Sequence, residues 1–149
     1  MIVGGGPAGL CTALFLADAA PELRDHIVVI EKERYPREKI CAGALGHRGD
    51  ACLGAIGVRV DVPHVRIDGI SVRVEGGTRV VRRADVGRVV RRADFDRALS
   101  EAALRRGITV RQGVRVTGVD VSPRGAIVRT CGGDIAAEVV VGADGVGSV

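Results

Sequence analysis

The chain has 149 residues, 46% of them hydrophobic and 27% charged, which is ordinary for one soluble domain with its own core. Its net charge of +4 comes mostly from scattered arginines, and two Phe, one Tyr and no Trp are too few for a base-stacking platform, which excludes a nucleic-acid partner. No stretch approaches the roughly 20 apolar residues of a membrane span, and no signal peptide precedes the first motif, so we expect a cytoplasmic protein without a transmembrane segment.

The cysteines and histidines show no spacing typical of a metal site or a disulfide framework. The four cysteines form no CxxC pair, and each of the three histidines stands alone among mixed polar residues. We therefore expect no metal site and assign no role to any histidine. No residue pattern identifies a catalytic acid, base or nucleophile.

The beginning of the chain predicts a β-α-β unit. Residues 1–3 form a short apolar run typical of a strand, and residues 7–20 carry apolar side chains at helical spacing. Pro7 suits the first turn of this helix, and Pro21 ends it. Residues 27–31 suit a strand that is buried on both faces of a parallel sheet.

The middle of the chain predicts a short helix and a pair of antiparallel strands. The glycines and proline of residues 34–57 suggest a loop that leads into a short helix. Residues 65–77 and 78–92 alternate Val or Ile with Arg or Glu and meet at Gly76 and Gly77. Each of these strands is expected to have one face in water.

The last third of the chain predicts a helix followed by strands. Residues 93–107 suit a helix capped by Gly107. Its inward side chains are expected to be Phe95, Leu99, Ala102 and Leu104. Residues 108–122, 125–130 and 134–145 have the composition of strands. The elements together predict an α/β fold with a parallel sheet and an antiparallel β-meander.

The residues VGGGPAG lie where the first predicted strand turns into the first predicted helix. At such a turn Gly4 permits the bend, Gly6 lets the backbone approach a pyrophosphate, and Gly9 lets helix and strand pack closely. The helix N-terminus adds free N–H groups and the positive end of the helix dipole. The motif therefore indicates a pyrophosphate-binding site. The alternative is a glycine-rich turn without a ligand.

Glu31 lies about 20 residues after this motif, at the end of the second predicted strand. A carboxylate there can accept hydrogen bonds from both hydroxyls of an adenosine ribose, and it repels a 2′-phosphate, which disfavours NADP in this site. The alternative is a surface charge at a strand end. The glycines and Glu31 would serve an NAD-dependent Rossmann dehydrogenase equally well.

Four stretches, in order, resemble a known group of flavoproteins: VGGGPAG with Glu31, PREKICAGAL, RRADFDRALSEAALRRGITV and VVVGADGVGSV. The group is the FAD-dependent oxidoreductases of the glutathione-reductase-like superfamily, in the branch that holds p-hydroxybenzoate-hydroxylase-type monooxygenases, flavin halogenases and geranylgeranyl reductases. PREKICAGAL resembles most the R-x-K-x-C-G-G segment of geranylgeranyl reductases, with Ala42 where that family usually has Gly.

The resemblance implies roles for the residues of PREKICAGAL. Main-chain atoms of Cys41, Ala42 and Ala44 would line the FAD site, and Arg37 or Lys39 would lie near the phosphates. The alternative for Cys41 is a small buried hydrophobic residue.

The resemblance also implies roles for residues further along the chain. It places Arg92 near the cofactor, Val114 where a strand meets the adenine, and Asp144 in the loop around the pyrophosphate, where the alternative is an ordinary turn aspartate. The complete set of expected FAD-binding residues is Gly4, Gly6, Ala8, Gly9, Glu31, Arg37, Cys41, Ala42, Ala44, Arg92, Val114 and Asp144.

For the whole chain, the resemblance implies an α/β, Rossmann-like FAD/NAD(P)-binding domain over residues 1–149 and an FAD-dependent oxidoreductase. NADH or NADPH is the candidate electron donor, and the partner is a small-molecule substrate, with peripheral membrane contact if that substrate is a prenyl lipid.

The relatives also have more residues before the first glycine and continue after the last motif into a substrate-binding sheet. We therefore expect a domain truncated at both ends, without its substrate domain and inactive alone. The alternatives are an NAD-dependent dehydrogenase, against which PREKICAGAL and the last motif argue, and a non-catalytic nucleotide-binding fragment.

Overall fold

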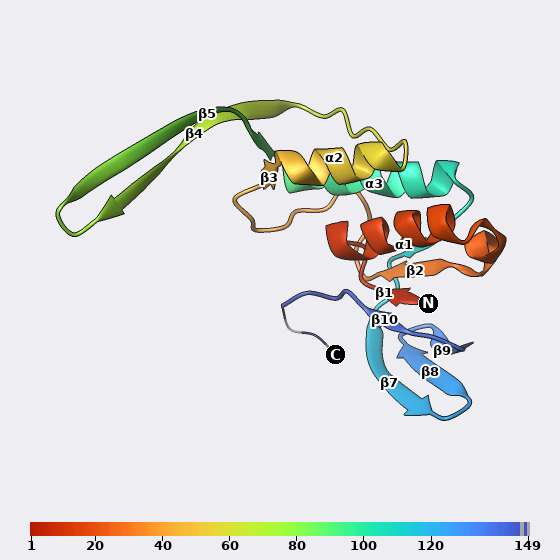
Figure 1. Ribbon diagram of the computed structural model, residues 1–149. Helices are drawn as coiled ribbons and strands as arrows, with labels where there is room; N and C mark the ends of the chain where they lie inside the picture. The colour runs from red at the N-terminus through yellow and green to blue at the C-terminus, as the bar shows by residue number, and fades with distance from the viewer. Residues whose placement is uncertain (147, 149) are drawn as a thin grey trace.

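The computed structural model describes residues 1–146 and 148 and is built around a parallel sheet (Figure 1). Four strands form this sheet in the order β10-β1-β2-β6, and all three pairings are parallel. The strands are β1 (Ile2–Val3), β2 (Val28–Glu31), β6 (Thr109–Gln112) and β10 (Val141–Gly142). The expected parallel sheet is confirmed, and its first two strands are those that the sequence predicts.

Helices cover one face of the sheet. Helix α1 (Pro7–Ala19) follows β1 directly, and its Leu10 and Leu14 are fully buried in the main core together with Ile2 and Val29 of the sheet. A short 3₁₀ helix, η1 (Pro21–His26), leads from α1 to β2. The predicted β-α-β unit is therefore confirmed, with Pro21 opening this 3₁₀ turn.

Helix α3 (Arg92–Arg105) contributes to the same core, beside α1 (Figure 1). Its Phe95 and Leu99 are buried, as expected, but Leu104 is 49% exposed and the prediction that it faces inward is wrong. Leu104 lies five residues after Leu99, off the helical stripe, and Ala103 at the fourth position is fully buried instead. Helix α2 (His47–Ala55) is the predicted short helix and contributes Leu53 to the core.

An antiparallel meander covers the other face of the sheet (Figure 1). It consists of β7 (Val116–Ser122), β8 (Gly125–Thr130) and β9 (Gly133–Ala137). Because successive side chains of a strand point to opposite faces, Val3 and Ile30 of the sheet point to this side and form a second core cluster with Val116 and Val128. The meander is confirmed as predicted.

Two strands predicted as continuous are interrupted. The run 108–122 divides into β6 of the parallel sheet and β7 of the meander, with Gly113 between them at a φ of +75°. The run 134–145 divides in the same way into β9 and β10. In both cases one apolar run supplies strands to two different sheets.

A long hairpin extends away from the rest of the molecule (Figure 1). Strands β4 (His64–Val74) and β5 (Gly77–Val90) pair antiparallel, and β3 (Ala44–Gly46) adds to β5 at the base. The predicted pair of strands is confirmed, but nearly all residues of β4 are exposed. The expectation that only one face lies in water is therefore wrong.

Candidate nucleotide-binding site

The order of the parallel strands locates the candidate site. From β1 the chain passes through α1 to β2 on one side, whereas β10 pairs with β1 on the other side. The strands that follow β1 in sequence, β2 and β6, lie on one side of it, and the chain then returns to add β10 on the other side, so the strand order reverses at β1. In open α/β sheets, ligands bind outside the carboxyl ends of the strands at such a point. In this chain that position is the loop that contains Gly4, Gly5 and Gly6.

The backbone of this loop excludes side chains at two glycines. Gly4 has a φ of +108°, and a Cβ atom on it would lie 2.2 Å from the carbonyl oxygen of Ala143. A Cβ atom on Gly9 would lie 1.9 Å from the carbonyl oxygen of Gly4. The expected structural roles, a tight bend at Gly4 and close helix packing at Gly9, are confirmed.

Gly6 differs from these two glycines because space is open beside it. A Cβ atom there would meet only the Nη2 atoms of Arg37 at 3.6 Å and Arg92 at 3.8 Å. Gly6 is the residue before α1, and no side chain caps this end of the helix. Two guanidinium groups therefore converge on a helix N-terminus whose first N–H groups are free of side-chain partners, an arrangement suited to anions. Ala8, also expected to bind FAD, is exposed in the first turn of α1.

A small cavity of about 90 Å³ lies at the carboxyl ends of β1 and β2. Among its lining residues are Gly4, Glu31, Val114 and Asp144. Four residues predicted from separate parts of the sequence therefore meet in one place. Val114 lies between β6 and β7, and its N–H donates to the carbonyl oxygen of Glu31 at 3.0 Å.

Glu31 is buried, so the alternative of a surface charge at the strand end is wrong. Its Oε2 accepts a hydrogen bond from the Gly5 N–H at 2.9 Å, and its Oε1 accepts one from the Glu33 N–H at 3.0 Å. The Arg37 Nη2 atom lies 3.3 Å from Oε2. A carboxylate can accept about four hydrogen bonds, so these contacts leave room for a ligand hydroxyl.

Asp96 of α3 joins the two arginines, although it is not among the site residues expected from the sequence. Its Oδ1 and Oδ2 accept hydrogen bonds from Nε and Nη2 of Arg92 at 2.8 and 2.9 Å, and Arg37 Nη2 lies 3.2 Å from Oδ2. The Asp96 side chain is fully buried. The four-residue spacing from Arg92 to Asp96 on a helix is the signal that could have found this pair.

Tyr35 is a second residue of the site that is not expected from the sequence. Its hydroxyl donates a hydrogen bond to the Gly5 carbonyl oxygen, and the Arg37 guanidinium lies 5.7 Å from the centre of its ring. Burial raises the pKa of Tyr35, so this hydroxyl stays protonated as a donor. Tyr35 therefore holds Arg37 and the glycine loop against each other.

The residues of PREKICAGAL lie between β2 and α2, on a loop that leads into β3. Cys41 and Ala42 are exposed on this loop, Ala44 is exposed in β3, and none of the three lines the cavity. The alternative of Cys41 as a buried hydrophobic residue is therefore wrong. Its thiol accepts a hydrogen bond from the Gly43 N–H at 3.4 Å, and this bond, with a further one from Arg92, lowers the pKa of Cys41.

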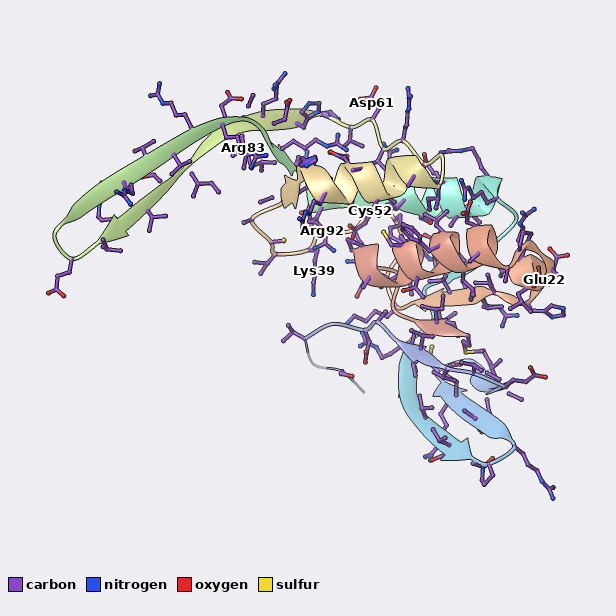
Figure 2. All side chains as sticks on the ribbon, in the orientation of Figure 1. Glu22, Lys39, Cys52, Asp61, Arg83 and Arg92 are labelled. Carbon is purple, nitrogen blue, oxygen red and sulfur yellow. The ribbon has the colours of Figure 1, made fainter. Side chains whose placement is uncertain are left out.

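Figure 2 shows Arg92 of α3 and Lys39 of this loop on the same side of the helices, the side from which the hairpin extends. Lys39 is exposed, whereas Arg37 keeps only 10% of its side chain in contact with solvent and faces Gly6. The structure thus brings together Gly6, Arg37, Cys41 and Arg92 beside α1. They lie next to the four predicted residues that line the cavity at the carboxyl ends of β1 and β2. In the part of the chain that the structure describes, His, Cys, Asp and Glu residues form no group that could hold a metal ion.

None of the helices among the described residues has the length and apolar character needed to cross a bilayer. No curated protein matches the chain.

Solved structures similar to this chain include flavin-dependent halogenases and a reductase-like protein. The flavin-dependent halogenase CmlS is 24% identical with a TM-score of 0.83, and the match covers 99% of this chain and 29% of that one. The myxobacterial chondrochloren halogenase CndH is 26% identical with a TM-score of 0.74, covering 97% and 36%. A geranylgeranyl bacteriochlorophyll reductase-like protein from Thermoplasma acidophilum is 23% identical with a TM-score of 0.75, covering 97% and 38%.

These matches extend over nearly all of the present chain but over only 29% to 38% of the two halogenases and the reductase-like protein. The fold is therefore that of the FAD-binding domain of such enzymes. The family model described as an FAD binding domain matches residues 1–149, and the chain belongs to this family.

Proposed function

We propose that this chain binds FAD through its ADP half, as the FAD-binding portion, residues 1–149, of a flavin-dependent oxidoreductase. The observation that carries the proposal is the open space beside Gly6, which faces the N-terminus of α1 and the guanidinium groups of Arg37 and Arg92. A pyrophosphate there would be held by backbone N–H groups, the helix dipole and two positive charges. The residues present therefore fit the cofactor that the family binds.

The cavity next to this position suits the adenosine. Glu31 would accept a hydrogen bond from a ribose hydroxyl, while the backbone at Gly4 and the side chain of Val114 would lie against the ribose and adenine. Asp144 lines the same cavity and would help to shape the loop near the pyrophosphate. The cavity is small in this structure, so part of the nucleotide would lie at its opening.

The loop from Cys41 to Ala44 is proposed to contact the cofactor through main-chain atoms. Its exposed position beside Arg92 supports this role, since the Arg92 guanidinium lies close to both Cys41 and Gly6. Ala8, exposed in the first turn of α1, would contribute its N–H group.

For a whole enzyme, the proposal is an FAD-dependent oxidoreductase acting on a small molecule, with NADH or NADPH as electron donor. Halogenase, monooxygenase and reductase-like proteins among the similar structures support this class, and PREKICAGAL favours a reductase of the geranylgeranyl reductase type. Bound FAD would supply the redox chemistry, and this chain's residues would bind and orient its ADP half. Bleaching of the flavin absorbance by NADH or NADPH, without oxygen, tests the donor.

The binding proposal is tested by calorimetric titration of the purified chain with FAD, ADP and FMN. FAD and ADP should bind with similar affinity, because the described site recognises the part that they share. FMN lacks the adenosine and one phosphate, and it should bind at least about tenfold more weakly, which corresponds to about 1.4 kcal/mol. Binding of FMN as tight as that of FAD, or absence of ADP binding, would contradict the proposal.

A further inference from the structure

Asp96 connects the two arginines that face the proposed pyrophosphate position. Its side chain is fully buried, and both oxygens contact guanidinium groups: Arg92 at 2.8 and 2.9 Å and Arg37 at 3.2 Å. Arg92 is bound in the bidentate geometry that fixes the plane of a guanidinium group. From these contacts, and resting on the proposed function, we propose that Asp96 is a positioning residue that directs Arg37 and Arg92 toward the N-terminus of α1 and thereby sets the affinity for the nucleotide's phosphates.

The contacts of Arg37 show that two carboxylates hold its guanidinium group in place. Its Nη2 atom lies between Glu31 Oε2 at 3.3 Å and Asp96 Oδ2 at 3.2 Å, while its Nε atom is buried without a hydrogen-bond partner. A buried donor without a partner is unfavourable. The guanidinium group therefore keeps this place through its two ion pairs, although one of its other donors is left unpaired.

A second ion pair on the same helix separates this role from ordinary helix stabilisation. Arg97 and Glu101 have the same four-residue spacing, but their closest N and O atoms are 3.9 Å apart and both side chains are about half exposed. Such surface pairs contribute little to stability. Only the pair of Arg92 and Asp96 is directed toward Gly6, so the Arg97 and Glu101 pair offers a matched control.

Charge compensation and positioning predict opposite effects when Asp96 becomes neutral. If Asp96 only offset the positive charge of the arginines, Asp96→Asn would strengthen the binding of a phosphate, because a nearby negative charge would be removed. If Asp96 positions the guanidinium groups, the same change would weaken phosphate binding. Asn keeps the size of the side chain, so the sign of the change in affinity distinguishes the two roles.

The experiment compares ADP with adenosine, which lacks phosphates, by calorimetric titration. Asp96→Asn should weaken ADP binding at least about tenfold and leave adenosine affinity unchanged, whereas the control Glu101→Gln should change neither. In an Arg92→Ala background, Asp96→Asn should have a smaller further effect, because only the part of its action that passes through Arg37 remains. Thermal melts of each variant establish that the chain is folded.

The outcomes separate this inference from the proposed function. If the unaltered chain does not bind ADP, the proposed function fails. If it binds ADP but Asp96→Asn binds ADP equally well or more tightly, or loses adenosine binding to the same extent, the positioning role is wrong.

A further variant, Arg92→Lys, tests the positioning role if Asp96→Asn does not fold. Arg92→Lys keeps the positive charge but cannot bind both oxygens of Asp96. It should lose ADP affinity by a similar factor if orientation by Asp96 matters, and ADP affinity close to that of the unaltered chain would overturn the proposal.

Discussion

Gly9 and Gly4 are in direct backbone contact, because a Cβ atom on Gly9 would lie 1.9 Å from the Gly4 carbonyl oxygen. Gly9→Ala must therefore move the first turn of α1 away from the end of β1. We expect it to lower the free energy of unfolding by about 1–3 kcal/mol or more, the usual cost of overpacking. Urea denaturation followed by circular dichroism measures this loss. A midpoint equal to that of the parent would show that the helix and strand are not packed as described.

Gly6→Val tests the open position three residues earlier. Its Cβ atom would have only ordinary contacts with the side chains of Arg37 and Arg92, and the φ of −79° suits any residue. Stability should fall by only about 1 kcal/mol, for a less favourable residue before the helix, while ADP binding is abolished because the side chain occupies the proposed phosphate position. If the variant binds ADP as well as the parent in the same titration, the glycine motif is only a turn.

Glu31→Ala should weaken ADP binding at least tenfold, since each charge-assisted hydrogen bond to a ribose hydroxyl is worth about 1.5–3 kcal/mol before desolvation. The parent should prefer ADP to 2′-deoxy-ADP, and the variant should lose this preference. Because Glu31 also accepts from the buried Gly5 N–H and pairs with Arg37, the free energy of unfolding should fall by about 1–3 kcal/mol. An unchanged preference between the two nucleotides would place the ribose elsewhere.

Cys41 and Cys11 should differ in their reaction with iodoacetamide. The Gly43 N–H and Arg92 lower the pKa of Cys41, whereas burial raises the pKa of Cys11. The thiolate is the reactive form, so Cys41 should react faster than Cys11, and its rate should reach its plateau at lower pH. Mass spectrometry of peptides after timed alkylation measures both rates. Arg92→Ala should shift the Cys41 profile to higher pH, and an unshifted profile would show that Arg92 does not act on this thiol.

The local parts of the fold could be predicted from the sequence because they depend on residues close together in the chain. The β-α-β unit follows from apolar runs and from Pro7 and Pro21, and the bend at Gly4 and the packing at Gly9 follow from glycine spacing. The inward position of Leu104 is wrong because the stripe through Leu99 continues at Ala103.

The site, by contrast, required segments that are distant in the chain. The glycine motif and Glu31 predict a nucleotide site, and the family resemblance places Arg92 near the cofactor, but neither shows that Glu31 is buried or that Asp96 joins Arg92 to Arg37. A carboxylate can be buried only where donors and cations from other segments surround it, and here they come from the glycine loop, the loop after β2 and α3. The expectation that only one face of the hairpin lies in water is wrong for the same reason. Alternation shows which residues share a face of a strand, but it does not show whether another element packs against that face.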